Sequence, residues 1–385
     1  MPHTLIAHST LDYHRTLVLA IELSNKSWVL AAQVPGLPHA KAKQTIEPTS
    51  EALMAAIDGY RSRANAAGCF VERVIATYEA GWSGFWLARW LARRDVETHV
   101  IQPSSVPVDR RARRAKSDGI DAELLLRTLL AWLRGEPRVC SMVPIPSEAD
   151  EDARRSIRER SELVAERVGL VNRIGAVLAT LGASNYDPLR RDRRQRLEEL
   201  RTALGDPLPV NAHAKIVRML DRLELLLEQI AELNRLRDAV LNDDVPDKAG
   251  EMIQQLAALR GIGVQSATVL VREAFVRHFA NGKALGSYAG LAATPYSSGS
   301  SNREQGIGKA GNRRLRTVMV ELAWLWQRYQ PGSAHVRWYR ERAGATGARM
   351  RKVMVVALAR KLLVALWRFV TQGVVPEGAA MKPVS

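Results

Sequence analysis

The stretch TLVLAIELSNKSWVLAAQV, residues 16–34, begins the pattern that decides the fold. It contains two apolar runs of strand length, residues 16–22 and 27–34, on either side of the turn-forming SNK. Helices and strands are then predicted to alternate, with helices at residues 50–66, 82–94 and 118–133 and strands at residues 71–78 and 96–101. A pair of strands followed by this alternation predicts an α/β fold for the N-terminal region.

The sequence beyond Gly135 has a different character. PRVCSMVPIPSEAD, residues 137–150, is rich in proline and is typical of a linker. A long charged helix is predicted at residues 148–181 and a second helix at residues 216–240. The second helix carries apolar residues at alternating spacings of four and three, the pattern of a coiled-coil seam: Met219, Leu223, Leu226, Ile230 and Leu233.

After the break NDDVPDKAG, residues 242–250, the chain is predicted to be mainly helical to its C-terminus. The predicted fold class is therefore α/β plus α, with domains at residues 1–135, 136–250 and 251–385. A hydrophobic fraction of 46% supports cores of this size and excludes a mainly disordered chain.

The charge of the chain points to a polyanionic partner. There are 56 Lys and Arg residues against 40 Asp and Glu, a formal net charge of +16, and 45 of the cations are arginine. Arginine presents a planar fork that fits phosphate groups and guanine edges. A genome rich in G and C would also favour arginine over lysine, but it would not explain the net charge. The excess therefore predicts nucleic acid as the partner.

Other classes of protein are disfavoured. Cys69 and Cys140 lack the spacing of a zinc knuckle or of a disulfide framework. The N-terminal MPHTLIAHSTLDYHR lacks the apolar core of a signal peptide, and the apolar run Val353–Ala359 is short and bounded by basic residues. We expect a soluble, cytoplasmic protein with no membrane partner.

Four carboxylates fall where an α/β fold could bring them together. Glu22 ends the first strand and Glu79 follows a later one, while Asp118 and Asp121 lie three apart at a helix start. Four carboxylates in one cleft would repel one another unless divalent cations neutralised them. Acidic residues at a helix start also simply favour the helix dipole. The strand-end positions of Glu22 and Glu79 favour a site for Mg²⁺ or Mn²⁺.

Basic residues cluster in three places: residues 109–116, residues 190–196 and the segment after a serine-rich stretch. Each cluster could be a solvated face or could contact a nucleic-acid backbone. The predicted nucleic-acid-binding residues are Arg110, Arg111, Arg113, Arg114, Lys116, Arg303, Lys309, Arg313, Arg314 and Arg316.

The serine-rich stretch, YSSGSSNR at residues 296–303, lies between an apolar segment and a strongly helical one that starts near Asn312. Such loops are typically linkers, and chemistry alone favours a flexible phosphate-binding loop. A hydroxyl among cations could instead attack a phosphodiester, because the cations stabilise charge that builds on the phosphorus oxygens. The earlier GIG, residues 261–263, could present backbone N–H groups to a phosphate or be an ordinary turn between packed helices.

Taken together, these motifs resemble those of the DEDD transposases of the IS-one-ten/IS-one-eleven-eleven group of insertion sequences, the bridge-RNA-guided serine recombinases. The resemblance covers nearly the whole chain. It rests on LAIELSNKSW, YEAGWSGFWLARWL and KSDGIDAELL in the N-terminal part, and on LRGIGVQSA, YAGLAATPYSSGSSNREQGIGKAGNRRLR and RKVMVVALARKLLVALWR in the C-terminal part.

The resemblance implies an N-terminal RuvC-like domain of the RNase H fold, a coiled-coil middle and a C-terminal transposase domain with a nucleophilic serine. Glu79, Asp118 and Asp121 fall on three of the four acidic positions. The remaining position is normally Asp and here is Glu22, whose extra methylene requires the metal geometry to adjust. The serine that precedes glycine in SSG is Ser298, with Ser297 and Ser300 as alternatives.

The resemblance thus predicts a transposase that cleaves and exchanges DNA strands through a covalent serine–DNA intermediate. The expected partners are donor and target DNA, a structured non-coding guide RNA and further copies of the chain in a dimer or tetramer, at the bacterial nucleoid. Two alternative functions remain: a RuvC-like junction nuclease that uses metal-activated water, and an inactive remnant that only binds DNA or RNA.

Overall fold

The chain forms two units, Met1–Ser147 and Glu148–Ser385, and each is described by itself. The computed structural model describes residues 11–38, 43–106, 118–298, 301–308, 311–344 and 347–383, with the backbone alone for residues 118, 294–298 and 301–305. The boundary between the units lies within the predicted linker. The three predicted domain ranges stay predictions.

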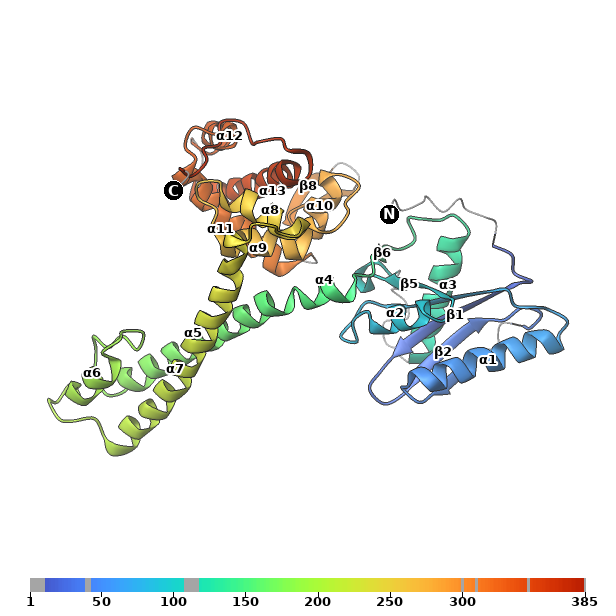
Figure 1. Cartoon of the computed structure of the whole chain (residues 1–385), viewed down its shortest axis with the longest axis horizontal. Helices are drawn as coiled ribbons and strands as arrows, with labels where there is room; N and C mark the ends of the chain where they lie inside the picture. Colours follow the sequence, from blue (N-terminus) through green and yellow to red (C-terminus); the bar gives the residue numbers. More distant parts are fainter. Residues whose placement is uncertain are drawn as a thin grey trace. The chain divides into compact units, whose positions relative to one another are not determined.

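Unit 1 is built on a mixed sheet whose described strands have the order β3-β2-β1-β4-β5-β6 (Figure 1). β1 pairs with β2 in antiparallel orientation and with β4 in parallel orientation, and β5 continues the parallel part. β3 and β6 are antiparallel additions at the two edges. The strands are β1 Thr16–Leu23, β2 Trp28–Gln33, β3 Lys43–Ile46, β4 Arg73–Glu79, β5 Val96–Ile101 and β6 Met142–Val143.

Helices cover both faces of this sheet. Successive side chains of β1 point to opposite faces, so Leu19 and Ile21 lie on one face and Val18 and Ala20 on the other. The first face packs against α1 Ser50–Ala66 and α2 Trp86–Ala92. The second face packs against α3 Asp118–Leu133. A strand buried on both faces needs apolar residues at every position, which explains the continuous run TLVLAI.

The predicted strands and helices of unit 1 are confirmed, with small shifts at their ends, and the fold is mixed α/β. α2 begins at Trp86 rather than at residue 82, after a turn at Gly84 with a φ of 68°. The sequence did not predict β3 or β6. Three of the four β3 residues are polar or charged, and β6 has only two residues, so neither shows the apolar alternation of a longer strand. The RuvC-like assignment of this unit stays a prediction.

Unit 2 is mainly helical, with a β-hairpin inserted late in the chain. The hairpin consists of β7 Ala293–Ser298 and β8 Ser301–Ile307, and a π-helical turn, Val271–Phe275, follows α9. The helices are α4 Glu148–Asp152, α5 Arg155–Ala179, α6 Arg193–Glu199, α7 Val210–Asp238, α8 Lys248–Ala257, α9 Val264–Leu270, α10 Gly282–Tyr288, α11 Arg313–Tyr329, α12 Ala334–Ala343 and α13 Ala348–Gln372.

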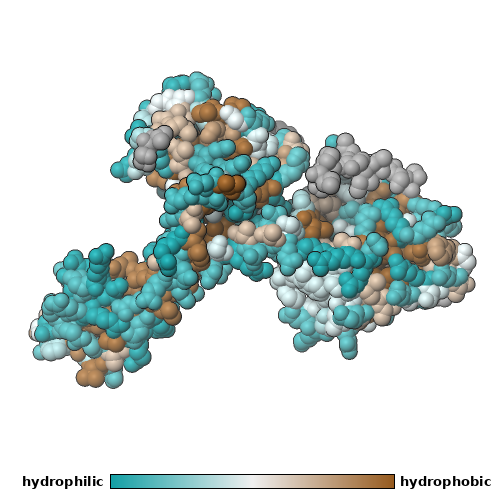
Figure 2. All heavy atoms as spheres, viewed as in Figure 1, coloured by the Kyte–Doolittle hydropathy of each residue, from teal (hydrophilic) through white to brown (hydrophobic). Residues whose placement is uncertain are grey.

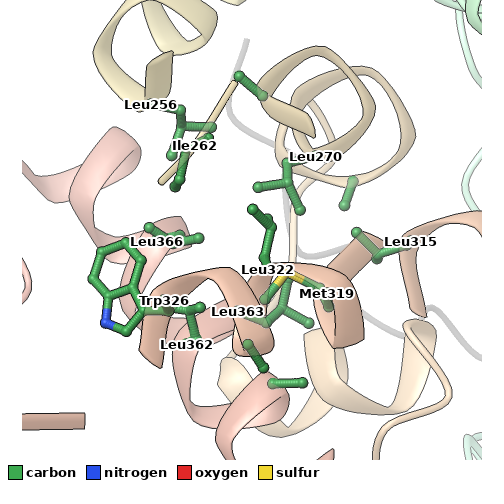
Figure 3. Close-up of a cluster of buried hydrophobic side chains, with 14 of the residues drawn as sticks. Leu256, Ile262, Leu270, Leu315, Met319, Leu322, Trp326, Leu362, Leu363 and Leu366 are labelled. Atoms are coloured by element: carbon green, nitrogen blue, oxygen red, sulfur yellow. The ribbon is translucent and has the colours of Figure 1, made fainter. Parts of the chain in front are cut away.

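The core of unit 2 lies among α8, α9, α11, α12 and α13. Figure 3 shows Trp326 of α11 beside Leu362 and Leu366 of α13. The buried Trp326 donates from its indole N–H to the Ser333 hydroxyl over 3.0 Å, which satisfies the one polar group of this side chain. One face of α13 is therefore fixed in the core, and this leaves its opposite face for other contacts.

α5 and α7 pack against each other and bury the predicted seam inside one chain. Met219, Leu223 and Leu226 of α7 share a hydrophobic cluster with Leu170 and Ile174 of α5. The seam residues already have apolar partners within the chain, so their spacing alone gives no reason to expect a second copy. A coiled-coil supercoil stays a prediction.

The arginine-rich run at residues 190–196 is engaged largely with carboxylates of the same unit. Arg194 of α6 donates to both Asp221 and Glu224 of α7 over 2.6 Å. Arg190 donates to Asp192 over 2.9 Å. The run therefore connects α6 to α7. This structural role differs from both the solvated face and the nucleic-acid contact that the sequence suggested.

Two further expectations for unit 2 are wrong in detail. The predicted helix at residues 148–181 breaks between α4 and α5, where the buried Arg154 donates from Nε to the backbone oxygen of Arg272 over 2.9 Å. The serine-rich segment, expected to be a flexible loop, forms β7 and β8.

Hydrophilic residues cover most of the visible surface (Figure 2). Within the described parts of the chain, no helix is both long enough and apolar enough to cross a membrane. Some large apolar side chains are nevertheless exposed, among them Leu204 and Val210 beside the start of α7, at 88% and 83%.

Candidate active site

Glu22 and Glu79 lie side by side at the carboxyl ends of two neighbouring parallel strands. The register pairs Ile21 of β1 with Tyr78 of β4, so the next residues along the two strands are Glu22 and Glu79. They follow Ala20 and Ile75 at even spacing, which places both on the sheet face that packs against α3. Both residues are half-buried. The register thus places the two strand-end residues next to each other along the backbone, and their role as metal ligands stays a prediction.

α3, which carries the other two predicted carboxylates, covers the same sheet face. Ala122 and Leu125 pack onto the sheet, and Glu123 forms a 2.8 Å ion pair with Lys43 of β3. Asp121 is half-buried in the first turn. Asp118 is the first residue of the helix, and its side chain lies outside the described part of the structure.

This donor set fits a divalent cation in its chemistry but only in part in its geometry. Carboxylate oxygens are the ligands that Mg²⁺ and Mn²⁺ prefer. Among the side chains that the structure describes, no three His, Cys, Asp or Glu residues are close enough to hold one metal ion. The side chain of Asp118 lies outside the described part of the structure, so the four-carboxylate site stays a prediction.

On the same sheet face, polar side chains of β4 and β5 contact one another. His99 Nε2 lies 2.7 Å from Glu97 Oε1, and Arg73 donates from Nε to Glu97 over 2.9 Å. The hydrogen bond with His99 is the largest cause that lowers the pKa of Glu97 to about 2; burial opposes it and Arg73 adds to it. Glu97 is therefore a carboxylate whose charge is balanced within the unit.

The predicted nucleophile lies in the hairpin. Ser298 of β7 pairs with Ser301 of β8, and Ser297 pairs with Asn302, so Ser298 is the last residue of its strand before the turn. The side chains of Ser297 and Ser298 lie outside the described part of the structure, as does all of Ser300. The backbone thus places Ser298 at the end of the hairpin farthest from its base.

The two ends of the hairpin are joined tightly at its base. The Asn312 N–H donates to the Tyr288 oxygen over 2.7 Å, and the Gly308 N–H donates to the Ala292 oxygen over 3.1 Å. Gly290 has a φ of 66°, and a Cβ at this position would collide with the Arg316 guanidinium and the backbone of residue 308. Both the conformation and the close packing therefore require glycine at 290.

A buried carboxylate holds this base to the helical core. Glu273, in the π-helical turn, is 1% exposed and receives two hydrogen bonds from Arg158 of α5, over 3.0 and 3.1 Å. Asn312 donates to Glu273 over 2.9 Å and accepts from the Leu315 N–H, which caps α11. The Tyr288 hydroxyl donates to the Glu273 backbone oxygen over 3.0 Å.

The protonation of Glu273 follows from these partners. Burial raises its pKa, but the hydrogen bonds from Arg158 and Asn312, with the nearby arginine charges, lower it overall. The carboxylate is therefore ionised and paired, and it connects α5, the π-helical turn and both ends of the hairpin. Sequence reasoning did not identify Arg158, Glu273 or Tyr288; the available signal was a lone glutamate in the apolar run VLVREAF.

The structure describes few of the predicted nucleic-acid-binding side chains. Arg313 is exposed, Arg314 lies 3.7 Å from Glu162 of α5, and Arg316 lies beside Gly290. Outside the described side chains are Arg110, Arg111, Arg113, Arg114, Lys116, Arg303 and Lys309. The role of this set stays a prediction.

Comparisons with known proteins show what kind of protein carries these features. The family described as "Transposase IS116/IS110/IS902 family" matches residues 253–338, which run from α8 through the hairpin to α12. A putative transposase, y4rJ, from Sinorhizobium fredii is 46% identical over 374 residues, which cover 95% of this chain and 94% of the relative.

Two more distant relatives agree. A probable family 20 transposase of Pseudomonas aeruginosa is 28% identical, with 78% of this chain and 84% of the relative covered. The transposase for insertion sequence element IS1328 of Yersinia enterocolitica is 27% identical, with 78% and 85% covered. These similarities define the class of protein: a DNA-processing enzyme of transposition. The chain belongs to the IS116/IS110/IS902 family of transposases.

Proposed function

We propose that the chain cuts and rejoins DNA through a covalent intermediate in which Ser298 is joined to the DNA, with structured RNA as the guide. The observation that supports Ser298 most directly is the hairpin: it lies inside the family-matched segment, its base is anchored by Glu273, and Ser298 ends β7. Such anchoring limits the movement of the hairpin that carries the proposed nucleophile.

The chemistry conserves the number of phosphodiester bonds. The Ser298 oxygen attacks phosphorus, a bond from phosphorus to Ser298 forms, and the bond to a DNA oxygen breaks. The serine proton passes to water, and the released DNA oxygen takes up a proton. A DNA hydroxyl then attacks the same phosphorus, which restores the DNA link and frees Ser298.

Glu22, Glu79, Asp118 and Asp121 are the residues that would hold Mg²⁺ or Mn²⁺. A bound cation would supply positive charge to the phosphate oxygens during attack. The neighbouring positions of Glu22 and Glu79 support this proposal. Arg303 of the hairpin's return strand, with Lys309, Arg313, Arg314 and Arg316 further along the chain, would contact the DNA backbone.

Trapping of the intermediate tests the proposed nucleophile. The full chain is incubated with Mg²⁺, labelled DNA that flanks its gene and RNA transcribed from that DNA, and the products are separated on a denaturing gel. We expect a labelled protein–DNA adduct with the wild type, with Ser297→Ala and with Ser300→Ala, and none with Ser298→Ala.

Other outcomes would assign the chemistry differently. Loss of the adduct with Ser297→Ala or Ser300→Ala, but not with Ser298→Ala, would move the nucleophile to that residue. Cleaved DNA without any adduct would indicate a junction nuclease that uses water. Binding without Mg²⁺-dependent cleavage would indicate an inactive remnant.

Assembly as a dimer or tetramer at the nucleoid is part of the proposal. Its support is the exposed apolar surface near α6 and α7, where Leu204, Val210 and Leu225 are more than half exposed. Sedimentation of the full chain with and without DNA would measure the number of copies.

A further inference from the structure

A large groove runs beside the base of the hairpin in unit 2. Its volume is about 1100 Å³. It is bounded by the start of α10, by α12 and α13, by the segment 374–377, and by Ala293, Gly306 and Ile307 of the hairpin. Small-molecule sites usually measure about 300–1,000 Å³ and are largely enclosed, so this open groove is better suited to a chain-like ligand.

α13 divides its residues between the core and this groove. Val355, Leu358 and Leu362 lie in the hydrophobic core. Val353, Val356, Arg360, Val364 and Arg368 line the groove, at spacings of three and four that place them on one helix face. The groove-facing side of α13 therefore mixes apolar and basic residues along its length.

The charge of the groove is strongly positive. Five cations line it, and the single acidic residue, Glu377, lies 3.2 Å from Arg337. Lys361 lies 4.9 Å from the ring centre of Trp338. Within the described part of the chain, no ion pair neutralises any of these five cations, which are Lys283, Lys352, Arg360, Lys361 and Arg368.

The floor of the groove is apolar and open to solvent. Val353, Val374 and Val375 are 54%, 56% and 50% exposed, and Trp338 lies among them as a half-buried ring. Exposed apolar surface of this extent, bordered by charges, marks a binding site more often than an ordinary surface.

We propose that this groove binds an unpaired DNA strand next to the hairpin. The cations would contact the phosphates, and the bases would lie against Trp338 and the valines. A duplex would satisfy the cations but would leave the apolar floor without contacts, because its bases are stacked inside. The inference rests on the proposed function, in which DNA is cut and rejoined at the hairpin, and it adds a place for one unpaired strand.

The charge and the position of the groove favour a DNA strand as its occupant. A second copy of this basic chain would bring further positive charge to a groove that is already lined by five cations and one carboxylate. A DNA strand brings one negative charge per nucleotide. The groove also adjoins Ala293 and Ile307, the paired residues at the foot of the hairpin whose other end carries Ser298.

Fluorescence anisotropy of the full chain with three probes tests the proposal: a labelled twelve-nucleotide oligo(dT), the matching DNA duplex and oligo(U) RNA. The test variant combines Lys352→Gln, Arg360→Gln and Arg368→Gln. The control variant removes the same charge from α7 through Lys215→Gln, Arg222→Gln and Arg235→Gln. Thermal unfolding verifies that both variants fold.

We expect the groove variant to bind oligo(dT) at least about 10-fold more weakly than the control variant does. Loss of three phosphate contacts should reduce the slope of log affinity against log salt by about 2. A second variant, Val374→Ser with Val375→Ser, should weaken binding of oligo(dT) while duplex binding stays unchanged, because only unpaired bases reach the floor.

Three results would overturn the proposal: equal binding by the groove and control variants, equal weakening of duplex and oligo(dT) by the groove variant, or loss of oligo(U) binding alone. Ser298→Ala should bind oligo(dT) as the wild type does, since binding requires no cleavage. An adduct that persists in Ser298→Ala would therefore refute the proposed nucleophile and leave the groove unaffected.

Discussion

The two carboxylate centres of the molecule differ in how their charges are arranged. At the carboxyl ends of β1 and β4 in unit 1, Glu22 and Glu79 bring two negative charges to neighbouring positions. In the core of unit 2, Glu273 has Arg158 and Asn312 as hydrogen-bond partners. Carboxylates at neighbouring positions offer the oxygen ligands that a divalent cation prefers, whereas a buried carboxylate is tolerated only when donors compensate its charge. The first arrangement supports the proposed cation site, and the second holds the hairpin in place.

Replacing Glu79 by Gln tests the first half of this comparison and should have the largest effect. The amide keeps the size of the side chain but removes its charge. We expect Mg²⁺-dependent DNA cleavage to fall by at least about 100-fold. The cleavage rate is measured over a range of Mg²⁺ concentrations, with the thermal unfolding temperature as a check on folding.

Glu47→Gln is the matched control for this change, since Glu47 is an exposed carboxylate of the same unit. It should cleave at the wild-type rate. If Glu79→Gln cleaves DNA at the same rate as this control, the carboxylates of Glu22 and Glu79 have no part in the reaction.

The sequence predicts that Glu22 and Glu79 lie at neighbouring strand ends, but it does not predict the partners of the buried Glu273, and the reason is physical. Glu22 and Glu79 each end an apolar strand run, and two parallel strands of one sheet bring such ends to the same edge. Glu273 finds its partners 115 and 39 residues away along the chain. Pairing over such distances depends on how helices pack, and no local pattern encodes it.

The hairpin and the groove were missed for related reasons. β7 and β8 contain serine, asparagine and glycine, which give no strand signal, and the ladder is identified only once the backbone pairing is known. The sequence of α13 already contains its apolar core face and its second face of mixed apolar and basic residues. Its basic residues, however, are typical of the solvated face of a core helix until α12 and segment 374–377 are known to line the same groove.

Removal of Arg158 tests the second half of the comparison. Arg158→Ala leaves the Glu273 carboxylate buried without its strongest partner, and we expect the free energy of unfolding to fall by about 3 kcal/mol. Glu273→Gln in the Arg158→Ala background should recover part of this loss, because a neutral amide needs less compensation. Urea unfolding of the full chain measures both changes.

The exposed neighbour Arg155, which pairs with Asp152 at 3.2 Å, supplies the control. Arg155→Ala should leave the free energy of unfolding nearly unchanged. If Arg158→Ala unfolds at the same urea concentration as Arg155→Ala, the ion pair between Arg158 and the buried Glu273 does not hold unit 2 together.

Acid should weaken unit 1 through another carboxylate, Glu97, whose pKa is lowered from the ordinary 4.5 to about 2. A lowered pKa in the folded state stabilises the fold above pH 4.5, and this contribution is lost as the pH falls towards 2. The difference in unfolding temperature between the wild type and Glu97→Gln should therefore shrink between about pH 5 and pH 3. A difference that stays constant over this range would contradict the assignment.

The smallest effect is expected at Arg194, whose side chain is 47% exposed although it pairs with Asp221 and Glu224. Water screens such pairs, so Arg194→Ala should change the free energy of unfolding by less than about 1 kcal/mol. Because its charge is already balanced by two carboxylates, the same substitution should also weaken oligo(dT) binding less than Arg360→Gln does. Anisotropy titrations of the two single variants compare them directly. If Arg194→Ala and Arg360→Gln lose the same oligo(dT) affinity, ion pairing within the chain does not distinguish structural arginines from DNA-binding ones.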